Sequence, residues 1–258
     1  MKKSSLLTTI FLLLAFSSGL YAQEEKGKEK KKKQQPENAF KVNLTGIALK
    51  NYSFQYERVL NRKISFALAF RTMPETGVPF KNTIIDLTDN DPDTKDVLES
   101  LKLSNTAITP EIRFYLSKKG YGRGFYIAPF YRYASFKASN VKFSYTNTLN
   151  TESDILLAGK VTANTGGLLI GSQWTIGKHF CLDLWILGPH YGSGKGSFTG
   201  TTSTPMTQAE QNDLRQELEN FDIPLTDKTV TVTANGATVK LDGPWGGLRS
   251  GLSFGFRF

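Results

Sequence analysis

The chain has 258 residues, of which 39% are hydrophobic and 21% are charged, and its formal net charge is +9 at pH 7. Mean hydropathy is -0.30. Beyond residue 22 no run approaches the about 20 apolar residues of a membrane-spanning helix, which excludes a helical membrane protein. Cys181 is the single cysteine, which excludes an intramolecular disulfide.

The first 22 residues have the three parts of a secretory signal peptide. Lys2 and Lys3 precede an apolar run at residues 6–16, and small residues follow before an expected cleavage after Ala22. A retained membrane anchor is the alternative. Residues 23–39 are rich in Glu and Lys and contain no aromatic or β-branched residue, so they cannot bury a core. We expect a disordered, charged periplasmic tail there, in preference to a nucleic-acid-binding patch.

From residue 40 to residue 258 the chain shows repeated segments in which apolar and polar residues alternate, the pattern of strands with two different faces. One row is apolar and often aromatic, while the other is small, polar or charged. A lipid-facing row opposite a polar interior row is typical of transmembrane barrel strands. Eight such strands are expected, at residues 40–49, 51–58, 63–72, 106–117, 125–137, 162–176, 179–191 and 245–258.

The connections between these segments alternate in length. Those after the second, fourth and sixth strands are short, and those after the third, fifth and seventh are long, which predicts periplasmic turns and outer loops respectively. The exception is the first outer connection, which is predicted to be a tight turn at Lys50-Asn51. The first long loop is predicted to contain a short helix near residues 97–101, and the second is a polar interval up to about residue 157. The last long interval, residues 192–243, is predicted to contain a helix at 208–221 and a hairpin around Asn235-Gly236, a preferred two-residue turn.

Three segments, residues 43–56, 109–133 and 184–192, are similar to an uncharacterised family of small outer-membrane barrels, and the chain resembles an OmpA-type barrel. The predicted fold is therefore all-β: an eight-stranded antiparallel up-and-down transmembrane β-barrel in the outer membrane of a Gram-negative cell. The resemblance implies no activity. The terminal aromatic row, Phe254, Phe256 and Phe258, resembles the signal that the outer-membrane assembly machinery reads.

Charged residues recur on the predicted inner row. The set expected to pair inside the barrel comprises Lys41, Glu57, Glu111, Arg113, Arg132, Asp183 and Arg249. Eight strands leave an interior just wide enough for side chains, so these charges are expected to form a network that closes the lumen. An ion path or a binding pocket is the alternative. Arg71 and Arg257 are expected near the outer and the inner rim.

Catalytic and metal-binding patterns are weak. His179 and His190 have opposite strand parity and are expected near opposite rims, so they cannot share a metal. Ser193 follows His190 closely, but no acid is placed to orient the imidazole. The acidic positions Asp89, Asp91 and Asp93 begin like a calcium loop but lack its glycine and its closing glutamate, which favours a solvated loop.

We therefore expect a non-enzymatic outer-membrane protein without a cofactor, acting as a structural or interaction protein through its outer loops. The expected partners are outer-membrane lipid and lipopolysaccharide, the assembly machinery and a larger envelope complex, with no nucleic acid. A barrel enzyme acting on lipid or peptide is one alternative. A secreted soluble β-barrel that binds a ligand is another, against which the outward aromatic rows argue.

Overall fold

The computed structural model describes residues 37–87, 92–147, 151–221 and 223–258. The expected signal peptide and most of the expected tail lie outside this part of the chain. The strands are β1 (Asn38–Asn43), β2 (Tyr52–Val59), β3 (Ile64–Gly77), β4 (Lys102–Tyr115), β5 (Gly124–Thr146), β6 (Glu152–Ile176), β7 (Phe180–Thr201), β8 (Asp227–Thr233) and β9 (Gly236–Arg257). The helices are α2 (Leu44–Ile47), α3 (Lys81–Leu87), α4 (Pro92–Ser100) and α5 (Gln208–Asn220).

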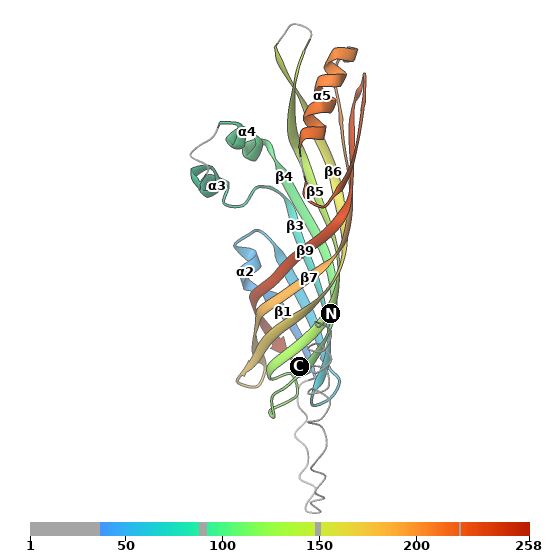
Figure 1. Ribbon diagram of the computed structural model, residues 1–258. Helices are drawn as coiled ribbons and strands as arrows, with labels where there is room; N and C mark the ends of the chain where they lie inside the picture. The colour runs from blue at the N-terminus through green and yellow to red at the C-terminus, as the bar shows by residue number, and fades with distance from the viewer. Residues whose placement is uncertain (1–36, 88–91, 148–150, 222) are drawn as a thin grey trace, which may run out of the picture. The chain divides into compact units, whose positions relative to one another are not determined.

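The strands form a closed, barrel-like ring, which we call the ring (Figure 1). Each strand from β1 to β7 pairs antiparallel with the next, β7 pairs with β9, and β9 pairs with β1. Eight strands thus close the ring, and β8 lies alongside β9 as a ninth strand. The expected all-β, antiparallel, up-and-down arrangement is confirmed. No helix among the described residues has the length and apolarity needed to cross a membrane.

Period-two alternation explains which side chains enter the ring. In β2 the burial alternates at every residue: Ser53, Gln55 and Glu57 are buried, while Tyr52 and Phe54 are exposed. The same two rows continue in the neighbouring strands, because paired residues of an antiparallel sheet point to the same face. The interior is therefore polar, and the outer surface of the ring is apolar.

The first strand is shorter than residues 40–49. It begins at Asn38, and Asn43 then caps α2, since its side-chain oxygen accepts a hydrogen bond from the Gly46 amide at 2.8 Å. Thr45 donates to the same oxygen at 2.9 Å. The alternation of apolar and polar residues continues past Asn43 and favours a strand there. The hydrogen bond that the Asn43 side chain accepts from the first turn stabilises a helix instead. The expected tight turn at residues 50–51 is thus a short helix followed by a turn.

Several strands run beyond the ring and form what we call the extension (Figure 1). It consists of the distal parts of β5, β6, β7 and β9 together with β8 and α5. The expected polar interval up to residue 157 is thus mostly strand, since β5 reaches Thr146 and β6 begins at Glu152, and much of 192–243 is also strand. These predictions were wrong because the extension strands carry no outward apolar row. Their apolar side chains point inward instead.

The helix α5 covers the inner face of the extension. It begins with a capping box between Thr207 and Glu210, and it ends one residue before the predicted boundary. Its Leu214 and Leu218 are fully buried against the inward row of the strands. The apolar core there comprises Ile155, Leu157, Met206, Leu214, Leu218, Val232, Ala237 and Val239. The β8–β9 hairpin is confirmed near the predicted place, with Thr233 paired to Gly236.

Helices α3 and α4 occupy the connection between β3 and β4. The structure makes α4 longer than the predicted helix near residues 97–101 and starts it earlier. Strands β3 and β4 also extend further into this interval than the alternation indicated. The short turns at the opposite end of the ring are confirmed, and the turn before β5 uses positive φ angles at Gly120, Gly122 and Gly124.

Candidate functional site

The centre of the ring holds a cluster of ion pairs around Arg113 on β4. This guanidinium lies 2.6 Å from Glu111, 2.7 Å from Asp183 and 3.4 Å from Glu57. All four side chains are fully buried. Burial of an isolated charge is very costly, so the three acids are what allow Arg113 to lie there.

Lys41 supplies the second cation of this cluster from β1. Its ammonium pairs with Glu57 at 2.5 Å and with Asp183 at 2.8 Å, and it also donates to Gln173. Gln173 in turn accepts from Arg113 at 3.1 Å. Each buried polar group therefore has several partners, and the network ties five strands of the ring together: β1, β2, β4, β6 and β7.

Arg249 on β9 joins the cluster from the other side of Glu111. Its guanidinium lies 3.1 Å from Glu111. The same group lies 4.4 Å from the ring centre of Phe130 and 4.8 Å from that of Trp185. Stacking on two aromatic faces fixes the plane of a guanidinium and adds to its binding. Six of the seven predicted interior charges are thus brought into one group, which we call the charge cluster: Lys41, Glu57, Glu111, Arg113, Asp183 and Arg249.

Arg132 is the exception among the predicted set. It is buried on β5, where its guanidinium donates to the Thr109 hydroxyl at 3.4 Å, and no ion pair among the described residues reaches it. The expectation that Arg132 needs Glu57, Glu111 or Asp183 is therefore wrong. Those acids face Lys41 and Arg113 at a lower level of the ring, whereas Thr109 and Arg132 lie one step above them.

Aromatic side chains fill the rest of this level. Tyr126 donates to Asp183 at 2.7 Å and Tyr115 donates to Glu57 at 2.6 Å, so both phenols extend the charge cluster. Two glycines of β6 make room for the rings. A Cβ at Gly171 would lie 2.4 Å from Tyr126, and one at Gly167 would lie 2.5 Å from Phe130. These glycines therefore leave the space that the two bulky side chains occupy.

The two histidines lie apart. His179 Nδ1 lies 3.3 Å from the Arg257 carbonyl oxygen, beside the β6–β7 turn. A bulge between Trp185 and Gly188 shifts the parity of β7, so His190 points inward and packs edge-on against Phe130. Ser193 is exposed, three residues along the strand, on the opposite face.

The structure places the remaining candidate site residues as follows. Cys181 is buried on the inner row, as expected from its parity. Asp89 and Asp91 lie outside the described residues, as does the side chain of Asp93, so the structure does not describe the acidic loop. Within the part of the chain that is described, no three His, Cys, Asp or Glu side chains gather as metal ligands do.

The terminal aromatic row lies on the outer surface of β9. Phe254, Phe256 and Phe258 are all exposed. Phe254 stacks on Phe180 of β7 with ring centres 5.5 Å apart, and Phe256 stacks on Phe258 at 6.2 Å. The backbone of Phe258 exchanges two hydrogen bonds of 3.0 Å with Asn38. The last residue therefore takes part in closing the ring.

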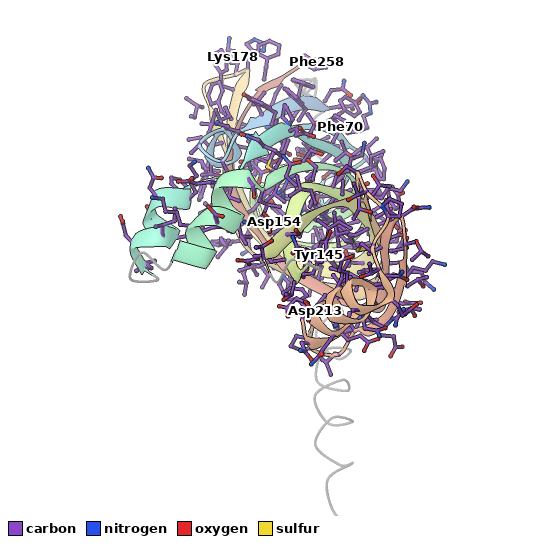
Figure 2. All side chains as sticks on the ribbon, turned by 90° about the horizontal axis from the view of Figure 1, so that it is seen from above. Phe70, Tyr145, Asp154, Lys178, Asp213 and Phe258 are labelled. Atoms are coloured by element: carbon purple, nitrogen blue, oxygen red, sulfur yellow. The ribbon has the colours of Figure 1, made fainter. Side chains whose placement is uncertain are left out.

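The outer connections are fastened by polar contacts. Lys142 on β5 pairs with Asp96 of α4 at 2.9 Å and with Asp154 of β6 at 3.1 Å. The hydrogen bonds with Asp96 and then Asp154 raise the pKa of Lys142 above its ordinary value. At the far end of β5 the Thr146 amide donates to Asp213 of α5 at 2.6 Å, next to Tyr145 (Figure 2).

Fold and interior together define a class: a closed antiparallel ring with an apolar outside and a charged, packed inside. Residues 8–194 match the family described as "protein of unknown function (DUF3575)", and the chain belongs to this family. No curated protein matches the chain. The family match carries no activity with it.

Proposed function

We propose that this protein is an integral outer-membrane β-barrel of the OmpA type, non-enzymatic, with a closed lumen, which acts as a structural or interaction protein through its outer parts. The observation that carries the proposal is the outer surface of the ring. Large apolar side chains are exposed on all eight strands that form it: Phe40, Phe54, Phe66, Leu68, Phe70, Ile112, Phe114, Tyr131, Leu168, Trp174, Phe180, Ile186, Phe254 and Phe256.

Such a surface favours lipid over water. Soluble monomers rarely expose a contiguous apolar patch of more than a few hundred Å². A closed ring also pairs most of its backbone groups within the sheet, as the interior of a bilayer requires. The exception is one edge of β9 at residues 243–252, which has no strand partner. The apolar stretch of β6 runs from Leu168 to Ile176, in keeping with the about 9 to 11 residues of a membrane-crossing strand.

The working surface in this proposal is the extension with α3 and α4. It continues the strands away from the end that carries the short turns and Phe258. Its outward residues are largely polar, as a part that projects into water requires. Lipid and lipopolysaccharide would then surround the ring, the assembly machinery would read the terminal strand, and an envelope partner would contact the extension.

Paired leucine-to-arginine variants test the membrane location. Leu68 and Leu225 are both exposed, but Leu68 lies on the ring and Leu225 in the connection before β8. An arginine facing lipid near the midplane costs about 2–4 kcal/mol, whereas one facing water costs almost nothing. We expect Leu68→Arg to lower the free energy of unfolding in bilayers by that amount, and Leu225→Arg to leave it unchanged.

Cell fractionation gives the second half of this test. The wild type should sediment with outer membranes, resist a high-salt wash and migrate faster on gels before boiling than after. Recovery in the soluble periplasmic fraction, with equal tolerance of both arginine variants, would show that the ring is surrounded by water and would support a secreted soluble binder instead.

A further inference from the structure

A cavity of about 410 Å³ lies inside the ring, next to the charge cluster. Several of the residues that line it are small, in contrast to the aromatic level beside it. Its walls include Ser53, Ala69, Thr109 and Gly251, whereas Tyr115, Tyr126 and Phe130 fill the neighbouring level. The space exists because short side chains on β2, β3, β4 and β9 meet at the same height.

Three guanidinium groups line this cavity: Arg71 from β3, Arg132 from β5 and Arg249 from β9. Thr109 on β4 lies between the first two in the sheet, since it pairs with Ala69 and accepts from Arg132. Arg71 is held by a 2.7 Å hydrogen bond from its Nε to Asn51. The three cations thus come from separate strands and converge on one space.

The charges of the cavity and of the charge cluster beside it do not balance without a further anion. In the charge cluster three cations, Lys41, Arg113 and Arg249, face three acids, Glu57, Glu111 and Asp183, and cancel. Arg71 and Arg132 are left over. Among the described residues no acid pairs with either of them. Two positive charges in a cavity with buried walls are costly unless an anion joins them.

The cavity reaches a free edge of the ring. Strand β9 pairs with β1 only up to Ser253, and with β8 only up to Asp242, so residues 243–252 have no strand partner on that edge. Leu248 and Ser250 line the cavity together with Arg249 and Gly251. Neighbouring residues of a strand point to opposite faces, so Leu248 and Ser250 lie on one face of β9 and Arg249 and Gly251 on the other. A cavity that touches all four residues therefore extends around the edge of β9. Exposed Leu49 lies at the same opening.

We propose that this cavity is a binding site for a phosphate-bearing anion, held by Arg71, Arg132 and Arg249 and entered along the unpaired edge of β9. Guanidinium groups present planar pairs of N–H donors that match phosphate oxygens. A phosphate monoester carries about -1.5 to -2 charges at pH 7, which matches the two cations left over. Free phosphate and a lipid phosphate headgroup share this chemistry, and in the second case the acyl chains would leave past Leu49 and Leu248.

The test measures binding to the full chain, refolded in micelles of a sugar-based detergent in a phosphate-free buffer. One arm adds inorganic phosphate, and the other adds phosphatidic acid to the micelles. We expect at least one probe to raise the temperature of unfolding. Stabilisation by inorganic phosphate identifies a soluble ligand, and stabilisation by phosphatidic acid alone identifies a lipid headgroup entering from the side.

Variants locate the site. Arg132→Gln should weaken binding of the effective probe by about tenfold to a hundredfold, the equivalent of one charge-assisted hydrogen bond. It should also raise the stability of the ligand-free protein, since it removes an unpaired buried cation. Arg71→Gln, at a less buried position, is the second variant, and Lys178→Gln in the exposed β6–β7 turn is the control with the same change of charge. No stabilisation by either probe, or full affinity in both arginine variants, would overturn the proposal.

Discussion

Arg113 and Asp183 meet across the interior of the ring, with the guanidinium of the first 2.7 Å from the carboxylate of the second. One lies on β4 and the other on β7, with β5 and β6 between them in the sheet. An ion pair that bridges non-neighbouring strands through the interior occupies the path that a solute would take. Lys41 reaches the same carboxylate from β1 at 2.8 Å.

The first prediction is that the lumen does not conduct ions. The charge cluster and the aromatic residues Tyr115, Tyr126 and Trp185 fill the ring at one level, where all of them are buried. Eight strands enclose little more than their own side chains. Planar-bilayer recordings on refolded wild-type protein should therefore show no stable channel. A reproducible conductance of nanosiemens size would mean that the interior charges line a pore.

The second prediction compares two aspartates. Asp183 contacts Lys41, Arg113 and Tyr126, so Asp183→Ala leaves buried cations short of one acid and should cost about 3–5 kcal/mol of unfolding free energy. Asp242 pairs with Lys195 at 2.7 Å on the exposed extension, and Asp242→Ala should cost about 0–1 kcal/mol. Urea titrations of both variants in lipid vesicles measure the difference. Equal losses would show that water screens the charge cluster.

Sequence alternation identified which charges enter the ring, but not how they pair. Parity along a strand fixes the face of each residue, and it placed Lys41, Glu57 and Arg113 correctly on the inner row. Pairing depends on the height of each residue in the ring, which follows from the register between strands. Arg132 lies one level too high to reach the acids, and alternation contains no information on that offset.

The extension was missed for a different physical reason. Ile155 and Leu157 follow strand periodicity, but they point inward and are covered by Leu214 and Leu218 of α5. A search for outward apolar rows recognises only strands that face lipid. The helix itself was predicted nearly to its ends, because its apolar spacing is a local signal. The capping box at Thr207, seen in the structure, is a second local signal that the prediction did not use.

A third prediction concerns two glycines of β6. A Cβ at Gly171 would lie 2.4 Å from the ring of Tyr126 and 2.8 Å from the carbonyl oxygen of Leu184, whereas one at Gly166 would meet nothing within 4 Å. Gly171→Ala should therefore destabilise the protein by about 1–3 kcal/mol through overpacking. Gly166→Ala, on the outward face of the same strand, should be close to neutral. Comparable effects in the two variants would exclude overpacking as the cause.

A fourth prediction is that the extension can lose its core while the ring persists. Leu214 of α5 is fully buried against the extension strands, and truncation of a buried leucine to alanine costs about 2–5 kcal/mol. The ring shares none of the residues of this apolar core. Leu214→Ala should therefore speed proteolysis within α5 and leave the heat-modifiable migration of the ring unchanged. Gln216→Ala, at an exposed position of the same helix, is less disruptive and serves as the control. Loss of heat-modifiability in Leu214→Ala would show that extension and ring fold as one unit.

The last prediction separates two roles of the terminal aromatic row. Phe258 and Phe180 are both exposed on the outer face of the ring, and both lie next to Phe256, with ring centres 6.2 Å and 5.8 Å away. Each substitution to alanine removes one aromatic from the lipid-facing surface, so a purely packing role predicts similar losses.

If the assembly machinery reads the end of the chain, the two variants will differ. Phe258→Ala should lower the amount of protein in the outer membrane and increase degradation in the periplasm, while Phe180→Ala should assemble almost normally. The backbone hydrogen bonds between Phe258 and Asn38 do not involve the side chain and should survive the substitution, so the protein should still refold in detergent. Membrane fractions probed by immunoblotting, beside refolding yields in vitro, measure both effects. Equal outer-membrane levels for the two variants would remove the signal and leave Phe258 as a lipid contact.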